Sequence, residues 1–102
     1  GYLQRAVNLR PTHAATRNDL GYAMILAGRY DDAYRQLATA RELAPSDQRA
    51  TRNMILLHYV LGNRVEADAL ADGSSLPDAE RARLRQQAAR LVASQRGVIG
   101  GS

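Results

Sequence analysis

Residues that break helices recur along this chain at nearly constant intervals, and that spacing limits the folds open to it. The breaks are Pro11, Gly28, Pro45, Gly62 and Pro77, so the intervals between them are 17, 17, 17 and 15. Proline cannot continue a helix because it lacks a backbone donor, and glycine is favoured just past a helix end. Each interval therefore has room for one short helix and a turn.

Between the breaks, apolar residues follow the spacing of an α-helix. Ala33, Leu37, Ala40 and Ala44 lie three or four residues apart, which places them on one helix face. No segment alternates β-branched or aromatic residues with polar ones, as strands do. We therefore predict an all-α fold, with helices near residues 2–10, 14–27, 30–43, 48–61, 64–72 and 77–95.

The breaks are part of an internal repeat with a period of 34. Gly28 and Ala33 recur as Gly62 and Ala67, while residues 15–18 recur as 50–53 at a spacing of 35. The second unit thus has one residue fewer before its glycine, which leaves the register of the fourth helix open by one residue. A period of this length is typical of stacked helical hairpins.

At these positions the sequence resembles the tetratricopeptide (TPR) repeat family. Counting from Ala14, the family's small, aromatic, apolar and proline positions are matched by Leu20, Gly21, Gly28, Tyr30, Ala33, Leu37, Ala40 and Pro45. Arg17 replaces an expected Trp, and Met24 an expected aromatic residue. The resemblance implies an antiparallel helix-hairpin solenoid, in which we expect Gly21 and Ala33 to let two helices approach closely.

The repeat pattern divides the chain into parts. Ile55 stands where the second unit would carry its close-packing glycine, so we interpret that unit as degenerate. We predict a capping box at Ser75 and a final helix that covers the end of the array. The expected TPR domain, residues 1–96, consists of the end of a preceding repeat (1–13), a complete repeat (14–47), the degenerate repeat (48–76) and a capping helix (77–96), followed by a flexible tail (97–102).

Composition and motifs argue against catalysis. The chain has no cysteine, and neither His13 nor His58 has a second ligand at metal-binding spacing. No catalytic constellation and no phosphate-binding glycine loop are present. We expect no enzyme activity, no metal and no cofactor. The net charge of +4 invites a nucleic-acid interpretation, but the chain lacks Phe and Trp for base stacking, and we predict no nucleic acid as partner.

The remaining hypothesis is a surface that binds a protein. In the TPR pattern, the first helix of each hairpin lines a concave groove, where arginine suits a carboxylate and asparagine a peptide backbone. The partner-binding residues predicted on this basis are Asn18, Tyr22, Ile25, Arg49, Arg52, Leu56 and Tyr59. They fit a peptide or helix of acidic or amphipathic character. The alternative is that Arg49 and Arg52 are simply solvated and that Leu56 packs between repeats.

A narrower resemblance covers residues 14–95. The pairs Arg52-Asn53, Leu61-Gly62 and Glu66-Ala67, with similar short matches as far as residue 80, look like the C-terminal part of the TPR lipoproteins of tight-adherence (Tad) pilus systems. That family implies a pilotin, an assembly factor for the outer-membrane secretin. It would sit on the periplasmic face of the bacterial outer membrane, attached only through a lipid anchor upstream of this sequence.

Several functions stay open at this point. The leading hypothesis is a protein scaffold that binds a segment of a secretin subunit or another pilus-assembly component. The alternatives are a generic TPR adaptor or chaperone and a helical repeat that binds RNA. The RNA hypothesis rests on the related pentatricopeptide repeat, and the Gly21, Ala33, Ala40 and Pro45 set favours TPR instead.

Overall fold

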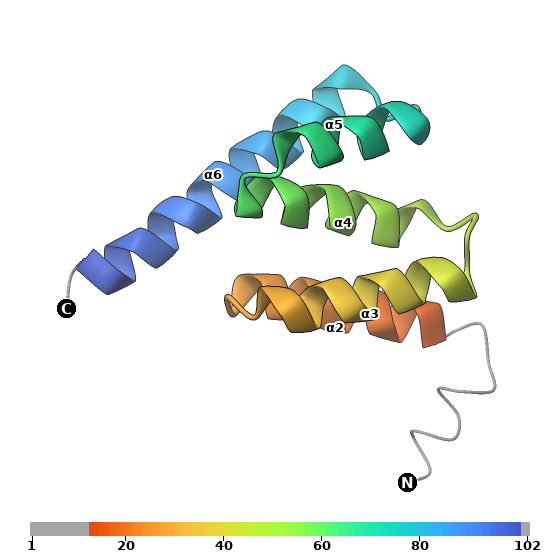
Figure 1. Ribbon diagram of the computed structural model, residues 1–102, viewed down its shortest axis with the longest axis horizontal. Coiled ribbons are helices and arrows are strands. Elements are labelled where there is room, and N and C mark those ends of the chain that lie inside the picture. The colour runs from red at the N-terminus through yellow and green to blue at the C-terminus, as the bar shows by residue number, and fades with distance from the viewer. Residues whose placement is uncertain (1–12, 101–102) are drawn as a thin grey trace, which may run out of the picture. The chain divides into compact units, whose positions relative to one another are not determined.

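The computed structural model describes residues 13–100, with side chains described as far as residue 95. Within this part of the chain it contains no strand and five helices (Figure 1): α2 (His13–Leu26), α3 (Tyr30–Leu43), α4 (Gln48–Leu61), α5 (Arg64–Gly73) and α6 (Asp78–Gly100). The all-α prediction is confirmed. The helix predicted at residues 2–10 lies outside the described residues.

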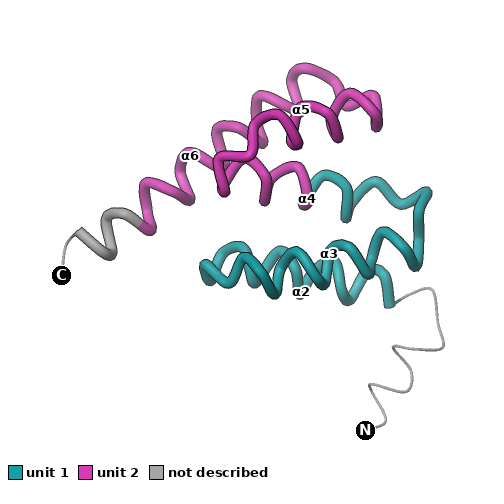
Figure 2. Tube along the Cα trace, in the orientation of Figure 1, with its two compact units in different colours: residues 1–53 teal, residues 54–102 magenta. Residues whose placement is uncertain are grey.

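The helix boundaries match the predicted spans to within a residue except at the end of α6. That helix continues to Gly100, past the predicted end at residue 95. The flexibility expected of residues 97–102 stays a prediction, although residues 97–100 have helical backbone. The chain divides into two compact units, residues 1–53 and 54–102, with the boundary inside α4 (Figure 2).

In the first unit, α2 and α3 form a hairpin built on a close approach at Gly21. A Cβ placed on Gly21 would lie 2.7 Å from Cγ and Cδ2 of Leu37 and 3.5 Å from the carbonyl oxygen of Ala33. Gly21 therefore makes room chiefly for the Leu37 side chain, and Ala33, also fully buried, contributes its backbone. Arg17, at the expected Trp position, donates from Nη1 to Oε1 of Gln36 at 3.1 Å and so links the two helices.

The second unit contains its own apolar core. Ile55, Ala67, Ala71 and Leu76 form one buried cluster. Tyr59, Leu70 and Leu84 pack against this cluster from its edge. Arg81 on α6 pairs with Asp72 on α5, with 2.9 Å between Nη2 and Oδ1, so an ion pair adds to the apolar contacts between these helices.

Three helices end in the same hydrogen-bonded turn. The amide of Arg29 donates to the carbonyl of Met24, that of Asn63 to His58, and that of Leu76 to Ala71, each spanning five residues. The residue just before each donor has positive φ: Gly28 (76°), Gly62 (80°) and Ser75 (54°). This is the Schellman pattern, in which a left-handed residue lets the last carbonyls of a helix find donors.

Ser75 therefore does not do what the sequence predicted. We expected it to open a capping box for the last helix, but it ends α5 in the left-handed conformation. Pro77 stands directly before α6, and its carbonyl accepts from the Arg81 amide at 3.0 Å. The predicted box fails because the chain needs Ser75 for the preceding turn.

Candidate partner-binding surface

The second unit carries a surface pocket of about 460 Å³. Its wall is formed by residues of α4, the following turn, the start of α5 and the middle of α6. The lining residues are Tyr59, Gly62, Arg64, Arg85, Ala88, Ala89, Val92 and Ala93. The pocket thus combines an apolar floor with a polar rim.

The floor comes from one face of α6. Arg85, Ala88, Ala89, Val92 and Ala93 are separated by three or four residues, which places them on one side of the helix over about two turns. Ala88 is buried, Val92 half-buried, and Ala89 and Ala93 exposed. Because three of these side chains are alanines, a ligand is able to approach the helix backbone closely.

The rim is held by polar contacts that join α4, α5 and α6. The Tyr59 hydroxyl donates to Oδ1 of Asp68 at 2.6 Å, and the Arg85 guanidinium lies close enough to this hydroxyl to affect its pKa. Burial, and then the hydrogen bond to Asp68, raise the pKa of the Tyr59 phenol above its ordinary value of 10, against the opposing effect of Arg85. The phenol is therefore neutral at physiological pH and fixed in orientation.

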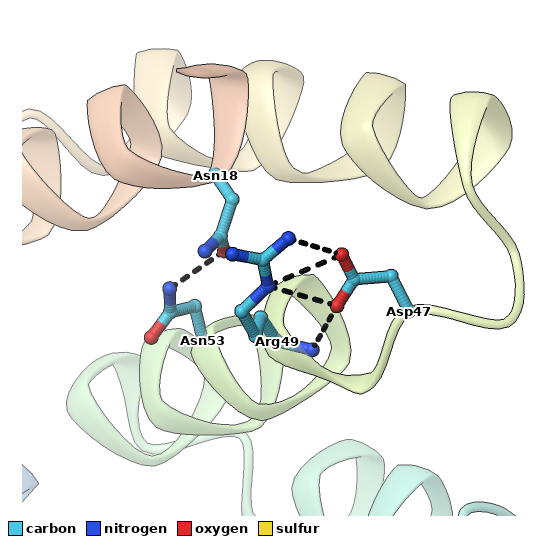
Figure 3. A network of polar contacts seen from close by, with 4 residues as sticks. All are labelled: Asn18, Asp47, Arg49 and Asn53. Carbon is cyan, nitrogen blue, oxygen red and sulfur yellow. Dashed lines mark hydrogen bonds and ion pairs between the residues drawn. The ribbon is translucent and has the colours of Figure 1, made fainter. Parts of the chain in front are cut away.

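In the first unit, two of the predicted groove residues are buried. Ile25 is fully buried, and only 7% of Asn18 is exposed. The Asn18 Oδ1 atom accepts from Nδ2 of Asn53 at 2.7 Å, which joins α2 to the first half of α4 (Figure 3). Asn18 thus holds helices together in this structure, and Ile25 offers no surface to a ligand. Tyr22 is half-buried.

Arg49 and Arg52 are both exposed, as the groove hypothesis requires. Arg49, however, already holds a carboxylate of this chain. Its Nη2 lies 2.6 Å from Oδ2 of Asp47, and its Nε lies 3.0 Å from Oδ1 and 3.1 Å from Oδ2 (Figure 3). A ligand carboxylate at Arg49 would have to compete with Asp47.

Asp47 has a structural task of its own. It precedes α4, and its Oδ1 accepts from the backbone amide of Arg49 at 3.0 Å, which is the geometry of a helix N-cap. The hydrogen bonds from the Arg49 side chain and then from its backbone amide lower the pKa of Asp47 from 3.8 to about 2. The pair therefore stabilises the start of α4, which explains both residues without a ligand.

The two predicted residues in the second unit differ from each other. Leu56 is fully buried, whereas Tyr59 lies on the pocket. The partner-binding set as a whole remains a prediction. The residues on the pocket that the sequence did not single out include Arg64, Arg85, Ala89 and Ala93. Their signal was present in the three- and four-residue spacing along α6, but that helix was interpreted only as a cap that covers the end of the array.

Neither a metal-binding cluster nor a membrane-spanning helix is found in the part of the chain that the structure describes. No group of three or more His, Asp or Glu side chains there is placed to hold a metal ion. Among the described helices, none combines the length and the hydropathy needed to cross a lipid bilayer.

The sequence is similar to proteins that carry tetratricopeptide repeats. The model of the tetratricopeptide repeat family matches residues 1–52. The TPR repeat-containing protein PA4299 of Pseudomonas aeruginosa is 35% identical over 88 residues, 86% of this chain and 36% of that protein. Tetratricopeptide repeat protein 21B of Mus musculus is 33% identical over 67 residues, 66% of this chain and 5% of that protein. No solved structure matches significantly.

The chain thus spans about a third of the bacterial relative and a small part of the mouse one. Both relatives carry the repeat in their names, and the match to the bacterial protein extends over most of the present sequence.

Proposed function

The chain belongs to the tetratricopeptide repeat family, and we propose that it is a scaffold that binds a partner protein through the pocket lined by α4, α5 and α6. Repeats of this family mediate protein–protein interaction and are not catalytic. The observation that carries the proposal is the pocket itself, which offers an apolar floor and a rim of two arginines and a tyrosine. Such a combination suits a ligand that has both an apolar and a polar part.

The narrower form of this proposal concerns the partner. The short matches to the TPR lipoproteins of Tad pilus systems support a pilotin that captures a segment of the secretin subunit. In that role the protein would lie at the periplasmic face of the outer membrane, held by a lipid on a residue upstream of this sequence. The generic alternative is an adaptor or chaperone for another partner.

A blocked pocket tests the scaffold function directly. Ala89 is exposed and lines the pocket, so Ala89→Trp should fill the floor without disturbing the core. Ala79→Trp is the matched control, because Ala79 is an exposed alanine in the first turn of the same helix and does not line the pocket. Calorimetry against the purified secretin subunit of the same organism should show binding by the unmodified chain and by Ala79→Trp only.

The possible results test the pocket, the pilotin role and the scaffold function separately. Equal binding by both tryptophan variants would reject the pocket as the binding surface. If the secretin subunit does not bind the unmodified chain, the pilotin proposal fails. The scaffold proposal then depends on whether partners captured from the cell envelope are lost with Ala89→Trp and kept with Ala79→Trp.

A further inference from the structure

We propose that the pocket selects an acidic, amphipathic helix, in which an Asp or Glu side chain meets Arg85 and an apolar side chain one or two turns away rests on the alanine and valine floor of α6. This inference rests on the proposed scaffold function and adds the chemistry of the partner segment. Three properties of the pocket support it: its charge, the fixed position of Arg85 and the spacing of the floor.

The charge around the pocket is positive. Its lining residues include Arg64 and Arg85 and no acidic residue. From Arg81 to Gly100 the sequence of α6 carries five arginines and no Asp or Glu. The Asp68 carboxylate does not line the pocket and accepts a hydrogen bond from the Tyr59 hydroxyl. A partner that carries carboxylates therefore associates faster than a neutral or basic one, and its charges also fix how it aligns with the pocket.

Arg85 is positioned before any ligand arrives. Its side chain is half-buried and lies close enough to the Tyr59 hydroxyl to lower the pKa of that phenol, and the hydroxyl is itself anchored to Asp68. A guanidinium held in this way loses less side-chain entropy when it pairs with a carboxylate than a free arginine does. Arginine also has five donors, so the contact with Tyr59 leaves others for a ligand.

The spacing of the floor sets the pattern of the partner. Ala88 and Ala89 lie three and four residues after Arg85, and Val92 and Ala93 lie seven and eight after it. With a rise of about 1.5 Å per residue, these positions are about 5 Å and about 11 Å along the helix axis. A partner helix that packs along α6 therefore needs one acidic residue opposite Arg85. It also needs apolar residues three or four positions and seven positions away from that acid. The alanines allow the two helices to come close.

A nucleic acid fits the pocket less well. Phosphates would pair with the two arginines, but the floor consists of alanine and valine, which give no surface for base stacking. The one aromatic ring among the lining residues, that of Tyr59, is held through its hydroxyl by Asp68.

Selection from a random peptide library tests the inference without knowledge of the natural partner. The probe is a displayed library of peptides four to five helical turns long, randomised with equal shares of acidic, basic, amide and apolar residues and selected on the full chain. We expect the selected peptides to carry Asp or Glu three, four or seven positions from Leu, Ile or Val. One selected peptide is then synthesised and measured by fluorescence anisotropy.

Matched variants assign the charge contact. Arg85→Gln should weaken the selected peptide roughly tenfold, as expected for a hydrogen bond to a charged group, and Arg64→Gln on the exposed rim about twofold to fivefold. Arg83→Gln is the control, because Arg83 is exposed on α6 and does not line the pocket. Changing the acid of the peptide to its amide should lower the affinity for the unmodified chain by the same factor. The same change should have little effect on the affinity for Arg85→Gln. Circular dichroism confirms that each variant is folded, and Arg85→Lys should keep part of the affinity.

Three results would overturn the inference while leaving the scaffold function in place. The first is selected peptides without enrichment of acids, and the second is equal affinity for the unmodified chain and Arg85→Gln. The third is that Arg83→Gln lowers the affinity as much as Arg85→Gln, because the contact is then general charge attraction. The scaffold function fails separately, when neither peptides nor captured proteins bind in a manner sensitive to Ala89→Trp.

Discussion

The two hairpins solve the same packing problem with the sizes of the side chains exchanged. In the first unit, Gly21 on α2 leaves space for Leu37 on α3. One repeat period later, the second unit has Ile55 on α4 and Ala71 on α5, which belong to one buried cluster. The large residue has moved from the second helix of the hairpin to the first. What the two hairpins share is one small and one large residue at these two repeat positions, and a unit that lacks the glycine need not be poorly packed.

The turns, by contrast, are kept with little change. Gly28 and Gly62 have φ values of 76° and 80° and take part in the same hydrogen bonds, one repeat period apart. The left-handed conformation is costly for any residue with a Cβ. A change at the neighbouring helix therefore cannot compensate for the loss of a turn glycine, as it can at the hairpin contact. The positions that look most alike in the two units are therefore the ones that set backbone conformation.

The comparison of the two hairpins predicts the largest loss of stability for a substitution at Ile55. If this residue fills the space beside Ala71, Ile55→Gly should leave a cavity and lower the free energy of unfolding by about 3–5 kcal/mol. Val65→Gly is the control, because Val65 is 79% exposed and its loss should cost about 1 kcal/mol or less, mainly through helix propensity. Urea unfolding followed by circular dichroism measures both. Similar costs for the two variants would show that Ile55 carries no special packing role.

A double-mutant cycle sharpens the comparison in the first unit. Gly21→Ile should overpack against Leu37 at a cost of about 1–3 kcal/mol, and Leu37→Ala should cost about 2–5 kcal/mol. Together they recreate the Ile and Ala pair of the second unit. The double variant should therefore be more stable than the sum of the single effects predicts, by about 1–3 kcal/mol. Strict additivity would disprove the exchange of volumes.

The start of α4 offers a smaller effect that depends on pH. Asp47→Ala should lower the free energy of unfolding by about 1 kcal/mol at neutral pH, because the helix loses its N-cap. The folded pKa of Asp47, about 2, lies below the ordinary 3.8, so its stabilisation is complete above about pH 5 and is lost as the pH falls through 2. Thermal melts between pH 7 and pH 2 should therefore converge for the variant and the unmodified chain. A constant difference over this range would contradict the assignment.

The smallest effect is a gain in stability at the third turn. Ser75 adopts a φ of 54°, where the other two turns have glycine. Ser75→Gly should therefore raise the free energy of unfolding by up to about 1 kcal/mol. Ser74→Gly serves as the control, because Ser74 has a φ of −98° and its hydroxyl donates to the Leu70 carbonyl at 2.8 Å. That neighbouring substitution should destabilise the protein, and thermal melts of the two variants measure the contrast.

Much of the fold could be predicted from the sequence because periodicity and helix breaks act locally. The spans of α3 and α4 agree with prediction to the residue, since Gly28, Pro45 and Gly62 bound them. The shared buried cluster of Ile55 and Ala71 was not predicted, because the two residues lie on different helices and one position alone does not show which residues pack around it. The role of Ser75 was predicted wrongly because the sequence does not show whether a serine caps the following helix or takes the left-handed conformation that ends the preceding one.

The candidate site was less accessible to sequence reasoning. Tyr59 was singled out from the repeat pattern and lies on the pocket, but Arg85, which lines the same pocket, was not. The two residues lie on different helices, and periodicity within one helix does not report such pairs. Arg49 was interpreted as a ligand anchor because the sequence does not show that its guanidinium already donates to the Asp47 carboxylate.

The exchanged sizes at the hairpin contacts also bear on how such arrays evolve by recombination. A crossover inside a hairpin would join α2 to α5, or α4 to α3. The first product places Gly21 opposite Ala71 and leaves a void, and the second places Ile55 opposite Leu37 and creates a clash. Genes assembled from these units should therefore tolerate breakpoints in the linkers between hairpins and reject those within them.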